Sequence, residues 1–315
     1  MKILITGAFG NLGLMCVSQA LESGYSVRCF DLDTPHNRQL AASFAGRIEA
    51  VFGNILDNEQ LRKVIGGVDA IVHNAALLPP MTDTHPEFAD SINIGACQKL
   101  IALAEQQTRK PVFVYPSSVT VFGLPAENES VRQISDAVIA TDNYTRQKIA
   151  IEATLKNSTL PWVVVRVGVS VDARTLKTDR GTFKKLLSVK ATNPLEYVHP
   201  KDVALAMCRA PQVREAYGKV LLLGGGKSCQ VTQHQFLSVA FEALGLTLPE
   251  SIHGNEPFYT HWMNTEESQK LLQFQQHDFL AYKNEMADKL KIIRILLWPL
   301  RWLVNPLLPV LLRLI

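Results

Sequence analysis

The chain alternates short apolar runs, rich in branched residues, with longer stretches that carry apolar positions on one side. Short apolar runs bounded by turn residues are typical of buried strands, and the longer stretches are typical of amphipathic helices. The predicted strands are Lys2–Thr6, Tyr25–Phe30, Ile48–Phe52, Ala70–His73, Val112–Tyr115 and Trp162–Val165. Strands that alternate with helices in this way predict an α/β fold, with a doubly wound parallel sheet and right-handed crossovers.

The pattern changes after residue 168, where the predicted elements become shorter. We expect strands at Glu196–Val198 and Val220–Leu223, and a helix that Thr232 caps, with Gln235 three residues later. The chain is therefore divided into a sheet domain, a smaller lobe and a tail, with the ranges 1–168, 169–280 and 281–315.

A glycine-rich turn, TGAFGNLG at residues 6–13, follows the first predicted strand and opens a helix at Asn11–Ser23. Gly7 allows the tight turn, Gly10 lets the backbone approach a pyrophosphate, and Gly13 lets the helix pack on the strand. The positive end of the helix dipole then attracts phosphate groups. The turn therefore predicts a dinucleotide site at the start of this helix.

Asp31 follows the second predicted strand, at the position where an acid binds the adenosine ribose hydroxyls of a dinucleotide. Its carboxylate would repel the ribose phosphate of NADP, so we expect NAD as the cofactor and NADP as the less favoured one. Asp33 is a second acid that could share this role. Arg28 lies inside the strand rather than after it, where it does not favour NADP.

Tyr144 and Lys148 stand four residues apart in the segment DNYTRQK. On a helix these positions share a face, so the ammonium of Lys148 can lie near the phenol of Tyr144 and favour its ionised form. A phenol with the ordinary pKa of about 10 is a poor base at neutral pH, and a nearby cation would lower that pKa. The same spacing occurs on many exposed helices, and the glycine turn upstream is what favours a catalytic pair.

Taken in chain order, these segments resemble those of the extended short-chain dehydrogenase/reductase superfamily, of the NAD-dependent epimerase/dehydratase type. The similar segments are TGAFGNLG, Asp31, GNI at 53–55, HNAA at 73–76, Asn93 with Gly95, SSVTVFG at 117–123, YTRQK at 144–148, Arg166 and EYVHPKDVA at 196–204. The resemblance implies a Rossmann-type sheet and a smaller C-terminal substrate-binding lobe that returns one strand to that sheet. Two residues depart from it: Asn54 replaces the usual acid near the adenine, and Phe122 replaces the usual tyrosine.

The resemblance also implies the roles of the site residues. Ser118 is implied to bind the substrate oxygen, Tyr144 to exchange the proton on that oxygen, and Lys148 to hold the nicotinamide ribose. The implied cofactor-binding residues are Gly7, Phe9, Gly10, Asn11, Leu12, Gly13, Asp31, Asn54, Ile55, Asn74, Ala75, Ala76, Asn93, Tyr144, Lys148 and Val167. Thr120, two residues beyond Ser118 on an extended segment, is a further candidate for substrate contact, and a hydroxyl satisfied by backbone is an equally good interpretation.

Residues that mark two branches of the family are missing. Val119 and Thr120 occupy the places of the acidic pair that a dehydratase needs, and Leu195 stands where sugar-nucleotide epimerases carry an arginine for the diphosphate. The loop AALLPPM, with Leu77, is apolar and suits a hydrophobic or small substrate, although plain packing is the alternative. The basic residues Arg174, Lys177, Arg180, Lys184, Lys185 and Lys190 could grip a carboxylate or phosphate, or form a solvated helix face.

Composition agrees with a folded enzyme in solution. Apolar residues make up 47% of the 315 residues and charged residues 19%, and a net charge of +3 is too small to indicate nucleic acid as a partner. The five cysteines are scattered without the spacing of metal ligands, so we expect no metal site. The first strand begins at Lys2 with no signal peptide before it, so we expect a cytoplasmic location.

The tail combines basic residues with a run rich in Leu, Ile and Trp. On one helix Lys291, Arg294, Arg301 and Asn305 form a polar stripe, and Trp298 and Trp302 lie near the border of a wide apolar face. Pro299, Pro306 and Pro309 would break a membrane-spanning helix, so a tail that lies peripherally on a membrane surface is the better interpretation. Packing on the chain's own fold, or a homodimer contact, is the alternative.

These observations lead to two main hypotheses. The first is an NAD-dependent dehydrogenase or reductase that transfers a hydride to or from a hydroxyl or ketone of an apolar, lipid-like or small substrate. The second is a nucleotide-sugar epimerase that oxidises and re-reduces its sugar and retains the cofactor. A non-enzymatic dinucleotide-binding module is disfavoured, because Ser118, Tyr144 and Lys148 are all present.

Overall fold

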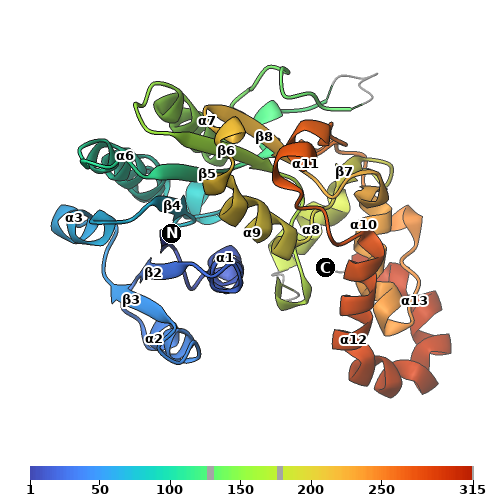
Figure 1. The fold of residues 1–315 in the computed structure, drawn as a ribbon. Coiled ribbons are helices and arrows are strands. Elements are labelled where there is room, and N and C mark those ends of the chain that lie inside the picture. The colour runs from blue at the N-terminus through green and yellow to red at the C-terminus, as the bar shows by residue number, and fades with distance from the viewer. Residues whose placement is uncertain (126–130, 176–179, 314–315) are drawn as a thin grey trace.

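The computed structural model describes residues 1–125, 131–175 and 180–313 of the chain. Its centre is a seven-stranded sheet in which every neighbouring pair of strands is parallel. The strands lie in the order β3 (Ile48–Phe52), β2 (Ser26–Asp31), β1 (Lys2–Thr6), β4 (Ala70–His73), β5 (Val112–Ser118), β6 (Trp162–Val167) and β8 (Lys219–Leu223) (Figure 1). The predicted parallel α/β sheet is confirmed, and one strand returns to it from the second half of the chain.

Helices cover both faces of this sheet. One face packs against α1 (Asn11–Glu22) and α9 (Pro200–Arg209), and the other packs against α3 (Asn58–Ile65), α6 (Cys97–Glu105) and α7 (Asn143–Lys156). Alternate residues of a strand point to opposite faces, so Ile3 and Ile5 of β1 join the first layer while Leu4 joins the second. Strands buried on both faces are apolar throughout, and this is why the sequence predicts them well.

Shorter helices complete this part of the fold. They are α2 (Pro35–Ala42), α4 (Met81–Thr84), α5 (Pro86–Asp90) and a π-helical segment at Ser91–Ala96 that leads into α6. A 3₁₀ turn at Val119–Phe122 follows β5.

The smaller lobe is built on an antiparallel pair of short strands. This pair is β7 (Pro194–Glu196) with β9 (Gln230–Thr232), and the helices are α8 (Arg180–Ser188), α10 (Gln233–Leu244), α11 (Glu266–Leu272), α12 (Phe279–Leu297) and α13 (Arg301–Arg313). The side chain of Thr232 caps α10 and forms a capping box with Gln235, as predicted. In Figure 1 the helices α10, α12 and α13 lie together on the right-hand side, away from β1 to β4.

Three strands differ from their predicted bounds by two residues or more, and β2 and β8 differ by one residue at one or both ends. β5 and β6 extend past Tyr115 and Val165, because the polar residues Ser117 and Arg166 pair in register inside the sheet. An apolar run cannot reveal this extension, since it depends on buried polar partners from another helix. The strand near Glu196 ends there rather than at Val198, because it pairs with β9 as a three-residue strand.

The tail forms two helices rather than one. Pro299 lies in a 3₁₀ turn between α12 and α13, after which α13 runs back toward the lobe (Figure 1). Leu308 and Leu312 of α13 are buried in an apolar cluster of the lobe. The Oδ1 of Asn305 accepts the backbone N–H of Thr247 at 3.0 Å, so the predicted polar stripe is wrong at Asn305.

Candidate functional site

The glycine turn brings three chain segments into close contact. Gly7 has a φ of +61°, and a Cβ there would lie 2.7 Å from the backbone nitrogen of Ala75. A Cβ on Gly13 would collide with the carbonyl oxygen of Gly7, so the third glycine lets α1 pack on the turn. Gly10 precedes α1 and no side chain caps this helix, so its first backbone N–H groups are available to an anion.

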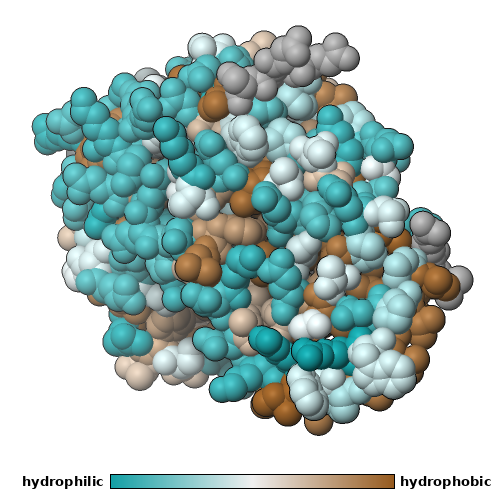
Figure 2. All heavy atoms as spheres, turned by 90° about the vertical axis from the view of Figure 1, so that its right-hand side faces the viewer, coloured by the Kyte–Doolittle hydropathy of each residue, from teal (hydrophilic) through white to brown (hydrophobic). Residues whose placement is uncertain are grey.

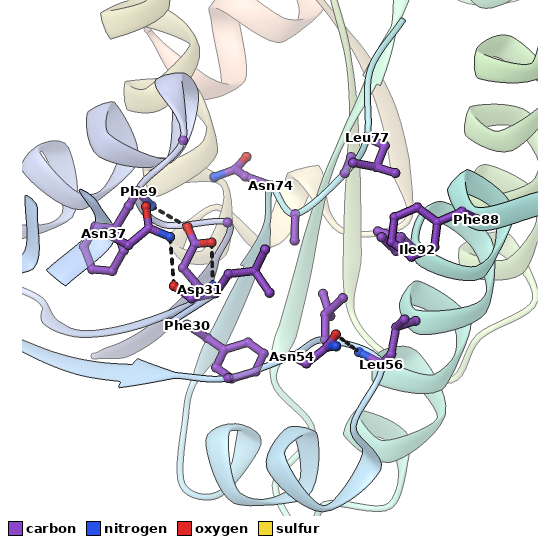
Figure 3. A pocket seen from close by; sticks show the side chains of 17 residues that line it. Phe9, Phe30, Asp31, Asn37, Asn54, Leu56, Asn74, Leu77, Phe88 and Ile92 are labelled. Atoms are coloured by element: carbon purple, nitrogen blue, oxygen red, sulfur yellow. Dashed lines mark hydrogen bonds between the residues drawn. The ribbon is translucent and has the colours of Figure 1, made fainter. Parts of the chain in front are cut away.

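The turn forms one wall of a hollow of about 350 Å³, called here the Asp31 hollow. Figure 3 shows the hollow between the glycine turn, the end of β2 and the segments after β3 and β4. The predicted cofactor residues that line it are Gly7, Phe9, Gly10, Asp31, Asn54, Ile55, Asn74, Ala75 and Ala76, and Leu77 lines it as well. Phe88 and Ile92 close the far side with apolar surface, which suits the flat face of an adenine ring.

The Asp31 carboxylate is held in place by backbone. Its Oδ2 accepts the N–H of Phe9 at 2.8 Å, and its Oδ1 accepts the N–H of Leu32 at 2.8 Å. Each carboxylate oxygen keeps a second lone pair for a ribose hydroxyl. Asn37, which the sequence reading overlooked, also lines the hollow, and its Nδ2 donates to the carbonyl of Leu32 at 2.9 Å (Figure 3).

Asp33 does not share the position of Asp31. Its carboxylate forms an exposed ion pair with Arg38, with nitrogen to oxygen distances of 2.6 and 2.7 Å, and it does not line the Asp31 hollow. Of the two acids considered from the sequence, Asp31 lines this hollow and Asp33 does not.

A second hollow of about 490 Å³ continues from the first, and we call it the Tyr144 hollow. The two share Gly7, Gly10, Asn74 and Ala76, so they form one crevice at the carboxyl ends of the parallel strands. The predicted residues Asn11, Leu12, Gly13, Ser118, Tyr144, Lys148 and Val167 line the second part. This is the edge at which open α/β sheets bind ligands.

The candidate catalytic residues converge on this second part of the crevice. Lys148 lies with its Nζ 5.5 Å from the ring centroid of Tyr144, and its Nζ donates to the carbonyl of Pro116 at 2.7 Å. Ser118 forms a side-chain hydrogen bond with Tyr144, and its Oγ also lies 2.9 Å from Oγ1 of Thr120. A hydroxyl, a phenol and an ammonium thus meet in one wall, a set that can exchange a proton with a bound oxygen.

Burial controls the ionisation of this pair in the unliganded chain. Burial raises the pKa of Tyr144 to about 12, which the hydrogen bond from Ser118 partly offsets and the charge of Asp142 reinforces. Burial lowers the pKa of Lys148 to about 8, although Cys97 and Glu152 act in the opposite direction. The expectation that Lys148 makes the phenol more acidic is therefore not met in this state, because desolvation outweighs the nearby cation.

A capping box sets the start of the helix that carries Tyr144. The Oδ1 of Asp142 accepts the backbone N–H of Thr145 at 2.7 Å, and the Oγ1 of Thr145 accepts the backbone N–H of Asp142 at 3.0 Å. These bonds satisfy donors that a helix start leaves free. Tyr144 therefore lies in the first turn of α7, one turn before Lys148.

A buried ion pair fixes α7 against the strands. Nε and Nη2 of Arg166 on β6 donate to the two carboxylate oxygens of Glu152 on α7, at 3.0 and 2.7 Å. The Oγ of Ser117 on β5 donates to Oε1 of the same carboxylate at 2.6 Å. Both charged side chains are almost fully buried. The ion pair holds α7, which carries Tyr144 and Lys148, against β6, and Ser117 joins this carboxylate to β5, which carries Ser118.

Two predicted contact residues lie behind the crevice rather than in it. Asn93 lines neither hollow; its Oδ1 accepts the N–H of Leu77 at 2.8 Å and its Nδ2 donates to the carbonyl of Leu77 at 2.8 Å. Thr120 also lines neither hollow and bonds to Ser118. Asn93 therefore positions the loop after β4. The contact of Asn93 with the cofactor and that of Thr120 with the substrate stay predictions.

An ion pair that the sequence did not predict lies in the crevice wall. Asp172 and Arg174 both line the Tyr144 hollow, with Nε of Arg174 at 2.8 Å from Oδ2 of Asp172. Nη2 of Arg174 donates to the carbonyl of Asn11 at 3.2 Å, which joins the lobe to the start of α1. Arg174 appeared only within a basic stretch of the sequence. Lys177 lies outside the described residues, and Lys184, Lys185 and Lys190 are exposed as a solvated face.

The shifted pKa of Lys148 predicts a pH dependence of stability. Its folded pKa of about 8 lies below the ordinary value of 10.5, so the unfolded chain binds more protons between these pH values. The Lys148 contribution to the free energy of unfolding therefore rises with pH across this window, on the order of 3 kcal/mol in total. Urea unfolding of the parent and of Lys148→Met, at about pH 7 and about pH 10, isolates this contribution.

We expect the stability of the parent relative to Lys148→Met to increase at the higher pH. The exposed Lys156 provides the matched control, because a Lys156→Met variant should keep a constant difference from the parent. A constant difference for Lys148→Met would contradict the depressed pKa.

The fold and the crevice agree with the resemblance to the extended short-chain dehydrogenase/reductase superfamily that the sequence motifs indicate. A family model for NAD(P)H-binding proteins matches residues 7–212, and the chain belongs to that family. The chain is therefore an NAD(P)-binding protein.

Curated relatives share limited identity with the chain. The uncharacterized protein y4nG of Sinorhizobium fredii is 29% identical over 224 residues, which cover 67% of this chain and 53% of that protein. A 3-beta-hydroxysteroid dehydrogenase of Mycolicibacterium neoaurum is 31% identical over 126 residues, which cover 38% of this chain and 32% of that enzyme. The matches thus span about half or less of the relatives' own lengths.

Solved structures resemble the fold over nearly its whole length. UDP-glucuronic acid 4-epimerase of Bacillus cereus superposes with a TM-score of 0.75 at 21% identity, covering 93% of this chain and 100% of that one. dTDP-glucose 4,6-dehydratase of Streptomyces venezuelae superposes with a TM-score of 0.78 at 20% identity, covering 93% and 98%. At such identities the likeness establishes the fold.

Proposed function

We propose that this protein is an NAD-dependent dehydrogenase or reductase that acts on a hydroxyl or ketone of an apolar or small substrate. The observation that carries the proposal is the convergence of Ser118, Tyr144 and Lys148 on the crevice that begins at the glycine turn. The free N–H groups at the start of α1 and the carboxylate of Asp31 at the other end match the phosphates and the adenosine ribose of NAD.

In this mechanism each of the three residues has a separate task. The bound nicotinamide supplies the hydride chemistry. Tyr144 exchanges the proton on the substrate oxygen, and Ser118 donates a hydrogen bond to the same oxygen. Lys148, held by the carbonyl of Pro116, fixes its ammonium beside the phenol. With a pKa of about 12 the phenol is protonated at neutral pH, which suits it to protonate a ketone oxygen during reduction.

The substrate class is inferred from the walls of the Tyr144 hollow. Leu78, Val171 and Val203 contribute apolar surface to it. Val119 and Thr120 occupy the two positions where a dehydratase carries an acidic pair. Val119 is buried in a 3₁₀ turn, and Thr120 bonds to Ser118. Among the relatives, several are steroid or sterol dehydrogenases. A lipid-like alcohol or ketone therefore fits the site best.

A nucleotide-sugar epimerase with a retained cofactor is the second candidate. Arg174 favours it, because this cation lines the Tyr144 hollow and could approach a diphosphate. Against this, Arg174 already pairs with Asp172, with a shortest distance of 2.6 Å.

The two functions differ in what happens to free NAD. The chain is incubated with NAD and separately with hydroxysteroids, short alcohols and UDP- or dTDP-sugars. Stoichiometric appearance of free NADH with an alcohol supports the dehydrogenase. Inversion of a sugar hydroxyl without free NADH would overturn it in favour of the epimerase. Tight cofactor binding without turnover of any compound would leave a binding module and overturn both.

The position of Asp31 predicts the choice of dinucleotide. We expect the parent to bind NAD at least about tenfold more tightly than NADP, because the carboxylate repels a ribose phosphate. Asp31→Asn keeps the shape and removes the charge, so it should narrow this ratio by about tenfold. Asp83→Asn, an exposed acid on α4, is the matched control. Titration calorimetry of the three proteins measures the ratio, and equal binding of both dinucleotides by the parent would contradict the assignment.

We also propose a cytoplasmic enzyme that reaches a lipid-like substrate from the surface of a membrane. The proposed contact with a membrane is supported by the exposed apolar residues of the last two helices.

A further inference from the structure

The last two helices leave a wide apolar surface without a partner in the described part of the chain. Eleven large apolar residues of this segment are 47 to 74% exposed: Ile292, Ile293, Ile295, Leu296, Trp298, Leu300, Trp302, Leu303, Leu307, Val310 and Leu311. We call this set the apolar corner, because it surrounds the turn between α12 and α13. Figure 2 views the side of the molecule on which these helices lie, and apolar side chains gather along its lower and right-hand edges.

The apolar corner is not needed to attach the helices to the lobe. The first half of α12 is anchored by Phe279, Tyr282 and Met286, which are buried in the core of the lobe. α13 is anchored by Leu308 and Leu312. The exposed residues point elsewhere, and contiguous exposed apolar surface of this kind marks an interaction site.

Basic residues border the apolar corner. Lys289, Lys291, Arg294 and Arg301 are all exposed, and the sequence has no acidic residue after Asp288. The guanidinium of Arg301 lies 5.4 Å from the ring centroid of Trp298, so one cation sits directly beside an exposed indole. Apolar and indole side chains with a basic border fit the interface of a bilayer that contains anionic lipid.

A second copy of the chain fits this surface less well. A symmetric dimer through the apolar corner would bring the same basic residues of the two copies together, and like charges across an interface are unfavourable.

A helix that spans the bilayer also fits less well. The segment Phe279–Leu312 is long and apolar enough to cross a membrane. However, Pro306 and Pro309 lie inside α13, and Arg301 lies near the middle of the segment, where its insertion costs roughly 2.5–3.5 kcal/mol. Crossing would also withdraw Tyr282 and Leu308 from the apolar clusters of the lobe.

We propose that the apolar corner inserts into one leaflet and docks the lobe on an anionic lipid surface. α12 links this surface to the crevice, since Oε1 of Glu285 accepts the N–H of Ala173 at 3.4 Å, next to Arg174 in the wall of the Tyr144 hollow. The helix that carries much of the apolar corner is thus also in contact with a segment of this wall. The proposal concerns the surface alone and does not rest on the proposed reaction.

Co-sedimentation of the full chain with vesicles tests the proposal. Vesicles of phosphatidylcholine with roughly one-third phosphatidylserine should retain the protein, and pure phosphatidylcholine should retain much less. Lys291→Glu with Arg294→Glu should weaken retention by about 30-fold or more, at about fivefold for each basic residue lost. Trp298→Ser with Trp302→Ser should weaken it by about tenfold or more.

Matched variants control for changes elsewhere. Leu280→Ser removes an apolar residue of α12 that is 59% exposed and lies outside the apolar corner, and Lys63→Glu with Lys99→Glu reverses two exposed charges on α3 and α6. Both controls should bind vesicles like the parent. In the parent, tryptophan emission should shift to the blue with anionic vesicles, and the double tryptophan variant should lose this shift while it keeps the parent's melting temperature.

Two outcomes would overturn the proposal. In the first, the parent fails to bind anionic vesicles at low salt, or binds them as tightly after either double substitution. In the second, light scattering shows a dimer that ignores vesicles and that Trp298→Ser with Trp302→Ser converts to a monomer, which would assign the apolar corner to a second copy. Neither measurement uses a substrate, so the result of this test is independent of the result of the turnover assay.

Discussion

Replacement of Tyr144 by Phe is expected to leave the fold and dinucleotide binding in place and to lower turnover by about 10² or more. The variant keeps the half-buried ring and loses the hydroxyl that Ser118 hydrogen-bonds. In the proposed mechanism the substrate oxygen then loses the hydroxyl that exchanges its proton, while the hydroxyl of Ser118 can still donate a hydrogen bond to it. Turnover of an accepted alcohol or ketone and the dissociation constant for NAD are measured side by side.

Tyr25→Phe is the matched control for this experiment. Its hydroxyl bonds to the carbonyl of Cys208 at 3.2 Å under α9 and does not line the crevice, so turnover should stay within about twofold. Near-normal turnover of Tyr144→Phe would remove Tyr144 as the proton donor. A parallel loss of NAD binding would show instead that the phenol holds the cofactor.

Replacement of Glu152 by Ala is expected to lower the free energy of unfolding by about 3–5 kcal/mol, because it leaves the guanidinium of Arg166 buried without its counter-charge. The side chains of Glu152 and Arg166 are only 3% and 4% exposed, so solvent cannot replace the lost carboxylate. Ser117 loses its acceptor as well. Urea unfolding of parent and variant measures the change.

Two further variants separate burial from mere pairing. Glu152→Leu combined with Arg166→Met removes both charges and should recover much of the loss, since an apolar pair needs no counter-charge. Glu267→Ala breaks an exposed pair with Lys219 and should cost under about 1 kcal/mol. A loss of under about 1 kcal/mol for Glu152→Ala would contradict the role of the buried pair.

The sequence predicted the parts of the fold that depend on local pattern. Ile48–Phe52 and Ala70–His73 were predicted to the residue, since both are mostly apolar runs that end directly before Gly53 and Asn74. The extensions of β5 and β6 could not be predicted, because Ser117 and Arg166 are tolerated in the sheet only through Glu152, a contact made in three dimensions. In the lobe, β9 was missed and β7 was predicted two residues too late, because three-residue strands carry little pattern.

In the candidate site, too, the residues of short motifs were predicted and the contacts made in three dimensions were not. The glycine turn, Asp31 and the segment with Tyr144 and Lys148 follow from short motifs, and the structure brings them to one crevice. Asn93 belongs to a segment that resembles the family, yet its amide is hydrogen-bonded to Leu77 in the loop after β4. A sequence motif does not show in which direction a side chain points.

The directions of the pKa shifts of Tyr144 and Lys148 could not be predicted from the sequence. The spacing of Tyr144 and Lys148 shows that they are neighbours, but it does not show how far each side chain is buried. Burial decides the direction of both pKa shifts.

The late position of β8 in the chain has a consequence for synthesis on the ribosome. β6 is complete once Val167 has emerged, yet its second neighbour begins only at Lys219. Until then β6 presents an open, apolar edge of the kind that pairs with other chains. Chains interrupted between these two strands therefore carry the whole glycine turn and Tyr144, and still lack the last strand of the sheet. For this protein the interval of translation between β6 and β8 is the period in which a chaperone has most to protect.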